Sequence, residues 1–344
     1  MSYSDAMQVG ILGASGFAGA ELLRLCAGHP ELEVAVAGGE SQAGRAVGDL
    51  YPSLRAVYPD LVLAAAGPAD LAGLDVVFLA LPHGASQEVV PALAEGGHRL
   101  VVDLSADFRL GDAATYEEWY GLAHGAPELL GRFVYGIPEL FGERLPGAAF
   151  VAAPGCYPTA AALALAPLVG AGLVETTGVV VDAASGVSGA GRSPKETTHF
   201  NAVDEDFSAY GLLRHRHTPE MEQAIGAQVL FTPHLAPMNR GILATCYARP
   251  AGRVVQAAVL ETLAEAYAGR RFVSVSEASP STKATLGSNS AQITARVDER
   301  TGWVVAICAL DNLGKGASGQ AVQCANLALG FDEAAGLSVA GVYP

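Results

Sequence analysis

The stretch QVGILGASGFAGAELLRLC, residues 8–26, decides the fold of the first half of this 344-residue chain. Its first five residues are an apolar run that predicts a short β-strand, and the spacing of the later leucines predicts an amphipathic helix. Within this stretch, Gly10, Gly13, Gly16 and Gly19 recur every third residue, in a G-x-x-G-x-x-G-x-x-G pattern. A glycine-rich turn from a strand into a helix offers backbone N–H groups to a pyrophosphate. The pattern therefore favours a dinucleotide-binding site over an ordinary strand–helix turn.

Strands and helices continue to alternate after this turn. Apolar or β-branched runs at 32–38, 74–81 and 99–105 predict strands, and residues 85–97 predict a helix. The run LDVVFLAL at 74–81 is continuously apolar after Asp75, which is typical of a strand buried on both faces of a parallel sheet. Roughly the first 150 residues are therefore expected to form an α/β, doubly wound parallel sheet of the Rossmann type.

The second half has a different pattern, because its strands follow one another with few helices. Strands are predicted at 177–186, 227–236, 240–249, 290–299 and 302–310, and one helix at 254–269 interrupts them. The last two strands are joined by ERTG, which is a plausible hairpin turn. This order predicts a separate α+β domain with a mixed, largely antiparallel sheet, followed by a final helix at 321–330.

The composition limits the possible partners and the compartment. The chain has 20 Lys and Arg against 35 Asp and Glu, a net charge of −15, which argues against nucleic acid and anionic membranes as partners. Residues 1–16 have no signal-peptide pattern, and the most apolar stretch, 159–174, is too short to span a bilayer. Five widely spaced cysteines without a CxxC motif indicate reduced thiols, no zinc or other metal, and a cytoplasmic protein.

Cys156 differs from the other cysteines in its sequence context. It lies in PGCYPT, residues 154–159, where Pro158 and Thr159 signal the start of a helix. A helix N-terminus lowers the pKa of a thiol, and a thiolate can attack an activated acyl group to form a thioester. The alternative is a structural cysteine, which is the better interpretation of the other four, since each lies in an apolar helix or strand.

A thiolate enzyme usually needs a histidine as acid and base. The densest cluster is RHRHTPE at 214–220, which holds His215 and His217, although alternating histidines are as often surface or phosphate-contacting residues. His83, in LALPHGAS, ends a predicted parallel strand, where ligands bind in such sheets, and it is expected to line the cofactor cleft.

Two segments are candidates for binding an anion. SADFR at 105–109 follows a strand and ends in Arg109. SGVSGAGRSPKE at 185–196 combines glycines with Arg192 and Lys195, which suits a phosphate, although a flexible surface loop is an equally good interpretation. For the ribose of the cofactor, Glu40 would indicate NAD, whereas Ser41 and Arg45 could hold the 2′-phosphate of NADP, and both stay open on this reasoning.

Motifs along nearly the whole chain resemble the N-acetyl-γ-glutamyl-phosphate reductase family of arginine biosynthesis. They run in family order: GASGFAGAELLRL (13–25), LALPHG (79–84), DLSADFRL (103–110), YGIPEL (135–140), APGCYPTAA (153–161), SGVSGAGR (185–192), HRHTPEM (215–221), PMNRGILAT (237–245) and DNLGKGASGQAVQ (311–323). The combination of GCYPT with HRHTPE is the specific part, whereas residues 193–214 depart most from the family. The resemblance implies reduction of N-acetyl-γ-glutamyl phosphate to the semialdehyde with NADP as cofactor, in a cytoplasmic homodimer or homotetramer.

The resemblance also implies roles for individual residues. Cys156 is expected to be the nucleophile and His217 the acid/base. The expected cofactor-binding residues are Gly13, Ser15, Gly16, Phe17, Ala18, Ser41, Arg45, Pro82, His83, Ser185, Gly186, Asn312, Lys315 and Gly316. The expected substrate-binding residues are Arg109, Gly189, Arg192, Lys195 and His215. The family's last helix returns to the nucleotide domain, so residues 1–153 and 315–344 are expected to form that domain and 154–314 the catalytic and dimerisation domain.

Two alternatives compete with this interpretation. The first is a related reductase acting on aspartyl phosphate or on carrier-linked aminoadipyl phosphate; the lysine-pathway reductases typically have Asn-Ala where this chain has Tyr157 and Pro158, which favours the arginine enzyme. The second is a nucleotide-sensing regulator in which Cys156 only packs against its neighbours. Modification of Cys156 with iodoacetamide, with and without substrate, distinguishes an enzyme from a sensor.

Overall fold

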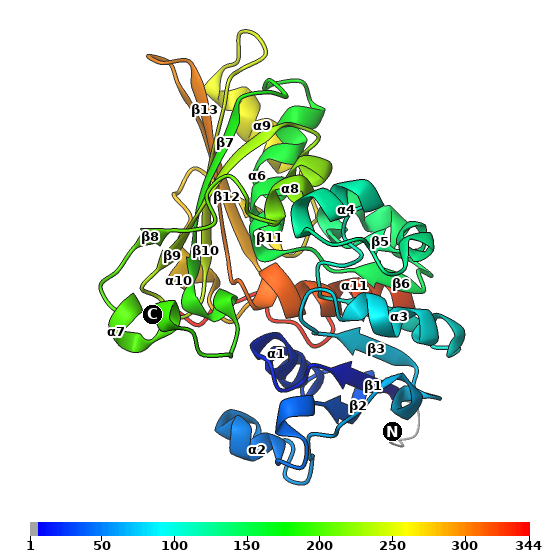
Figure 1. The fold of residues 1–344 in the computed structure, drawn as a ribbon. Helices are drawn as coiled ribbons and strands as arrows, with labels where there is room; N and C mark the ends of the chain where they lie inside the picture. The colour runs from blue at the N-terminus through cyan, green and yellow to red at the C-terminus, as the bar shows by residue number, and fades with distance from the viewer. Residues whose placement is uncertain (1–5) are drawn as a thin grey trace. The chain divides into compact units, whose positions relative to one another are not determined.

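The computed structural model describes residues 6–344, which divide into two compact units (Figure 1). Unit 1 runs to Pro154 and includes Ala317–Leu337, and unit 2 consists of Gly155–Gly316 and Ser338–Pro344. The expected division assigned all of 315–344 to the nucleotide domain, whereas residues 315–316 and 338–344 belong to unit 2. They do so because their backbone bonds to that unit, for example from the Val342 N–H to the Leu286 oxygen at 2.7 Å. Residues 1–5 of the stretch expected to lack a signal peptide lie outside the described residues.

Unit 1 is built on a six-stranded sheet in which all neighbouring strands are parallel, in the order β2-β1-β3-β4-β6-β5. The strands are β1 (Met7–Leu12), β2 (Leu32–Gly38), β3 (Val76–Leu79), β4 (Leu100–Asp103), β5 (Val134–Tyr135) and β6 (Phe150–Ala152). The helices are α1 (Phe17–Cys26), α2 (Val47–Leu50), α3 (Ser86–Glu95), α4 (Ala113–Tyr120), α5 (Pro138–Phe141) and α11 (Gly319–Leu329). The predicted doubly wound parallel sheet is confirmed.

Strand β3 shows how both faces of this sheet are buried. Val76 and Phe78 belong to a core cluster shared with α1 and α11, and Val77 and Leu79 belong to a second cluster shared with α3. All four side chains are fully buried, as expected for a continuous apolar run in a parallel sheet. Because α11 follows unit 2 in the sequence, unit 1 is completed only by the end of the chain.

Unit 2 contains a seven-stranded mixed sheet in the order β11-β12-β13-β10-β7-β9-β8. Its strands are β7 (Val179–Gly186), β8 (Ser208–Ala209), β9 (Val229–Ala236), β10 (Ile242–Ala248), β11 (Val273–Val275), β12 (Ala291–Asp298) and β13 (Trp303–Leu310). The pairs β7/β9 and β11/β12 are parallel, and the other four are antiparallel. The predicted mixed, largely antiparallel sheet is confirmed, and β12 and β13 form the expected hairpin, in which Gly302 has a φ of +72°.

The longer helices of unit 2 lie against one face of its sheet (Figure 1). They are α6 (Cys156–Gly170), α8 (His217–Ile225) and α9 (Gln256–Ala266), and the short α7 (Phe200–Val203) and α10 (Thr282–Thr285) complete the set. On the other face, alternate residues of β7, β9 and β10 stay partly exposed, and Leu230 is 51% exposed. Among the described residues, no helix has the length and apolar character needed to cross a membrane.

Candidate active site

The glycine-rich turn of unit 1 joins β1 to α1 as predicted. Gly13 adopts a φ of +87°, and a side chain there would place its Cβ 2.2 Å from the backbone oxygen of Ala80. Gly16 is the N-cap of α1, and within residues 6–344 no side chain caps this helix and no acidic residue lies in its first turn. The start of α1, at Phe17, therefore carries no first-turn carboxylate that would repel an anion, which suits a dinucleotide phosphate.

The other expected cofactor residues of unit 1 follow the next two strands. The Gly13 and Ala14 N–H groups both donate to the oxygen of Gly38, at 3.0 and 2.7 Å, so the end of β2 lies beside the turn. Beyond it, Glu40, Ser41 and Arg45 are all exposed, and this arrangement does not choose between NAD and NADP. Pro82 and His83 follow β3 and are also exposed.

The SADFR segment has an internal role. Arg109 is buried, and its guanidinium donates to the backbone oxygens of Ala153, at 2.8 Å, and Leu104, at 2.7 Å. The buried carboxylate of Asp107 accepts the N–H groups of Gly84, at 2.8 Å, and Gln87, at 3.2 Å. Asp107 thereby holds the turn that carries His83, so this segment supports one part of the expected cofactor site.

Cys156 is the first residue of α6 in unit 2, and Gly155 is the N-cap. Within the described residues, the N-cap residue of α6 supplies no side-chain cap and no acidic residue lies in the first turn of the helix. The helix dipole at this position favours the thiolate form of a cysteine. Cys156 is half-buried, whereas the other four cysteines, Cys26, Cys246, Cys308 and Cys324, are buried. Cys156 is therefore the cysteine best placed for reaction with a ligand.

His217 is the first residue of α8, and its imidazole packs directly on Gly155. A Cβ at Gly155 would lie 2.5 Å from Nε2 of His217 and 2.9 Å from both adjoining ring carbons. The predicted nucleophile and the predicted acid/base thus flank the same glycine. Their 61-residue separation in the sequence, from 156 to 217, is bridged by the packing of α8 on α6.

His215 lies in an aromatic cluster with Tyr157, Tyr210, Phe231 and His217, at ring-centroid distances of 4.9 to 5.8 Å. Burial, together with the charge of Arg216, lowers its pKa to about 4. The imidazole is therefore neutral near pH 7, and its Nδ1 accepts the backbone N–H of His217 at 3.2 Å. The uncharged His215 ring therefore helps to position the start of α8 and adds no positive charge to the site.

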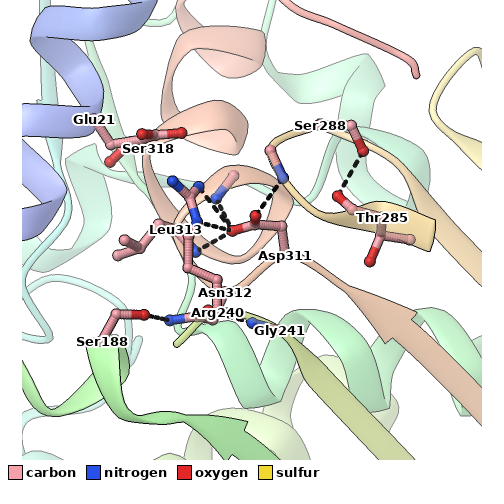
Figure 2. A network of polar contacts seen from close by, with 12 residues as sticks. Glu21, Ser188, Arg240, Gly241, Thr285, Ser288, Asp311, Asn312, Leu313 and Ser318 are labelled. Atoms are coloured by element: carbon pink, nitrogen blue, oxygen red, sulfur yellow. Dashed lines mark hydrogen bonds and ion pairs between the residues drawn. The ribbon is translucent and has the colours of Figure 1, made fainter. Parts of the chain in front are cut away.

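The turn that follows β13 lies against Cys156. A Cβ at Gly316 would lie 2.8 Å from the Cβ of Cys156. Figure 2 shows the polar network that shapes this turn: Oδ1 of Asp311 accepts from Arg240 Nε and Nη2, at 3.0 and 2.9 Å, and from the N–H groups of Leu313 and Gly314, both at 2.9 Å. The backbone oxygen of Asp311 also accepts the N–H of Gly316 at 2.9 Å.

The other expected ligand residues of unit 2 differ in exposure. Asn312 is buried and bonds to the Gly241 N–H and to Ser188, which makes it part of the network in Figure 2. Lys315 is fully buried near the ring of Phe272. Ser185 and Gly186 are buried at the end of β7, Arg192 is half-buried, and Gly189 and Lys195 are exposed.

Sequence reasoning missed three groups at this site. Tyr210 donates to the hydroxyl of Tyr157 at 3.1 Å, and Tyr157 donates to the backbone oxygen of His234 at 3.0 Å. Glu220 accepts the N–H of Gly155 at 2.8 Å, and the Arg240–Asp311 pair shapes the turn described above. Glu220 and the ion pair lie within the quoted motifs, whereas Tyr210 lies in the divergent stretch 193–214 and had no signal. Within residues 6–344, no cluster of three or more His, Cys, Asp or Glu side chains suits a metal ion.

Comparison with known families agrees with this division into units. The semialdehyde dehydrogenase NAD-binding domain matches residues 8–148, and the semialdehyde dehydrogenase dimerisation domain matches residues 156–312. Unit 1 is therefore a nicotinamide-nucleotide-binding domain, and unit 2 contains a dimerisation domain.

Curated relatives resemble the chain along nearly its whole length. The N-acetyl-γ-glutamyl-phosphate reductase of Symbiobacterium thermophilum is 51% identical, over 98% of this chain and 99% of its own, and that of Geotalea daltonii is 48% identical, over 98% and 100%. Among solved structures, the aspartate semialdehyde dehydrogenase of Candida albicans with NADP matches with a TM-score of 0.70 and 16% identity, over 94% of this chain and 98% of that one. Aspartate semialdehyde dehydrogenase II of Vibrio cholerae matches with a TM-score of 0.69, 16% identity and the same coverage. These structures share the fold.

Proposed function

The chain belongs to the N-acetyl-γ-glutamyl-phosphate reductase family of oxidoreductases, and from this membership we propose that it reduces N-acetyl-γ-glutamyl phosphate to N-acetylglutamate 5-semialdehyde, with release of phosphate. The observation that carries the proposal is the arrangement around Gly155, with Cys156 at the start of α6 and the imidazole of His217 against the same residue. A thiol at a helix N-terminus beside an imidazole is suited to nucleophilic catalysis at an acyl group.

In the proposed reaction, His217 takes the thiol proton and the Cys156 sulfur attacks the acyl carbon. The tetrahedral oxyanion is stabilised by backbone N–H groups at the start of α6, and the carbon–oxygen bond to phosphate then breaks, so phosphate leaves with the bonding electrons. A thioester on Cys156 remains, and a bound nicotinamide supplies the hydride that reduces it. Collapse of the resulting hemithioacetal oxyanion breaks the carbon–sulfur bond, releases the aldehyde and restores the thiolate, which His217 reprotonates.

The cofactor that we propose is NADP. The turn from β1 to α1 fits a pyrophosphate because Gly16 caps α1 and, in the described part of the chain, the first turn of the helix contains no acidic residue. Phe17 and Ala18 would contribute to that turn. Ser41 and the exposed guanidinium of Arg45 would hold the 2′-phosphate, and the structural neighbour from Candida albicans is titled as a complex with NADP.

We also propose a homodimer or homotetramer that acts in arginine biosynthesis in the cytoplasm. The partly exposed face of the sheet in unit 2, which includes Leu230, supports association through that unit. The five cysteines, all in the described part of the chain, form no disulfide, which supports a reducing compartment.

Single-turnover kinetics with Cys156→Ser and His217→Ala test the covalent scheme. We expect Cys156→Ser to abolish reduction of the acyl phosphate and His217→Ala to slow it by about 10²–10⁴-fold. Near-normal reduction by Cys156→Ser would refute the thioester, and a loss of only about threefold in His217→Ala would refute acid/base catalysis. Comparing N-acetylglutamyl phosphate with aspartyl phosphate and aminoadipyl phosphate, each with NADPH and NADH, tests the substrate and the cofactor.

A further inference from the structure

Glu220 is a buried acid that directly contacts the segment carrying the proposed nucleophile. It lies on α8, three residues after His217, and its side chain is 1% exposed. Its Oε1 atom accepts the backbone N–H of Gly155 at 2.8 Å. A buried N–H group that loses its acceptor is strongly destabilising, so this bond determines where the Gly155 peptide lies.

The same glycine is also in contact with His217. The imidazole covers one side of Gly155, where a Cβ would meet Nε2 at 2.5 Å, while the carboxylate of Glu220 holds its N–H. Two side chains of α8, one helical turn apart, therefore contact Gly155. Because Cys156 is the next residue, the bond from Glu220 sets the position of the thiol relative to the imidazole.

We propose that Glu220 is a positioning residue for the reaction of Cys156, acting through the Gly155 peptide. This inference rests on the proposed function, since it assigns Glu220 to the same pair of reacting groups. Without the bond, the peptide before α6 can rotate toward another hydrogen-bond acceptor, and Cys156 turns with it. Misplacement of a reacting group by about 1 Å can reduce the rate about 10²-fold.

The chain offers a matched control for this role. Glu222, on the same helix, accepts the N–H of Val229 at 2.9 Å through its own Oε1 atom. Glu222→Ala removes the same kind of bond from the same helix, but at a site away from Cys156. If only Glu220→Ala loses activity, the loss is caused by removal of the bond to Gly155 and not by removal of a carboxylate from α8 in general.

The experiment measures kcat, KM and the rate of alkylation of Cys156 by iodoacetamide, quantified by peptide mass. We expect Glu220→Ala to lower kcat at least about 10-fold, with KM within about twofold, and to change the alkylation rate at least about threefold. Glu220→Gln keeps an oxygen acceptor for Gly155 and should stay within about threefold of the parent in kcat. Glu222→Ala should react like the parent.

Several results would overturn the proposal. These are a Glu220→Ala enzyme with parental kcat and alkylation rate, a Glu220→Gln enzyme as slow as the alanine variant, or an equal loss in Glu222→Ala. If Glu220→Ala does not fold, Glu220→Asp, which shortens the side chain, must lower kcat more than Glu220→Gln does, and the reverse order refutes the role. The alkylation rate does not depend on turnover, so a failure of the thioester scheme, seen with Cys156→Ser, is distinguished from a failure of positioning by Glu220.

Discussion

Acidification should destabilise unit 2 through His215, whose imidazole is held neutral in its aromatic cluster. Burial and the charge of Arg216 lower the pKa of this group from its ordinary value of 6.5 to about 4 in the folded protein. The unfolded chain therefore binds a proton at a higher pH than the folded chain does. The sign follows from linkage: stability is fully present above pH 6.5 and is lost as the pH falls toward 4.

The two pKa values set the size of the effect. At pH 5 the imidazole is mainly protonated in the unfolded chain and mainly neutral in the folded one. Integrating the proton uptake from pH 8 to pH 5 gives a loss of about 2 kcal/mol at most from this one group, because part of the ring stays exposed. His215→Phe keeps an aromatic ring in the cluster and removes the titration, so the variant should lack this part of the acid sensitivity.

Urea unfolding at pH 8 and pH 5 measures the effect. In a Trp119→Phe background, the fluorescence of Trp303, in β13, reports on unit 2 alone, since these are the two tryptophans of the chain. The parent should lose more stability on acidification than His215→Phe, by up to about 2 kcal/mol, and the exposed His199→Phe should follow the parent. An equal loss in the parent and in His215→Phe, within about 0.5 kcal/mol, would show that His215 is not held neutral by its surroundings.

Three further predictions concern residues that contact the proposed site and the cofactor turn. In Gly316→Ala the new Cβ would lie 2.8 Å from that of Cys156, so this variant should lose about 1–3 kcal/mol of stability and at least about 10-fold in kcat. As a control, the exposed Gly252→Ala should leave kcat unchanged. Tyr210→Phe removes a hydroxyl–hydroxyl bond at 3.1 Å and should lower the urea stability of unit 2 by about 0.5–1.5 kcal/mol. Gly13→Ala should abolish NADPH binding in a fluorescence titration, because a φ of +87° and a 2.2 Å clash exclude a side chain; measurable binding would show that the turn is dispensable.

The parts of the fold that the sequence predicts are those with a local physical cause. After Asp75, the run at 74–81 has no polar residue to face water, which predicts burial on both faces, and Val76–Leu79 is fully buried in β3. The start of α6 was also predictable, because a proline such as Pro158 is favoured in the first turn of a helix and disfavoured further inside it. The short edge strands β8 and β11, of two and three residues, were missed because so few residues form no periodic pattern.

Long-range polar partners could not be predicted from the sequence. The helix α8 begins at His217 in a stretch rich in charged and polar residues, so its alternating histidines were as compatible with a surface or phosphate-contacting cluster as with an acid/base. Arg109 has the residue type of an anion ligand, yet its guanidinium binds backbone oxygens of its own unit. Arg109 binds the oxygen of Ala153, 44 residues away, as well as that of the nearby Leu104, and Glu220 of α8 binds the N–H of Gly155, 65 residues away. These partners are backbone groups, which carry no residue-specific signal.

A net charge of −15 does not by itself exclude an anionic ligand, because buried acids in each unit are occupied by backbone donors. Asp107, Glu220 and Asp311 are each at most 1% exposed, and each accepts one or more N–H groups from a loop that it holds in place. Within the described residues, α1 and α6 have no acid in the first turn, and the N-cap residue of neither helix supplies a side-chain cap. The N–H of Gly155 at the start of α6 is bound by Glu220. The dipole of each helix still places positive potential at its first turn, which attracts an anion even though the whole chain repels it.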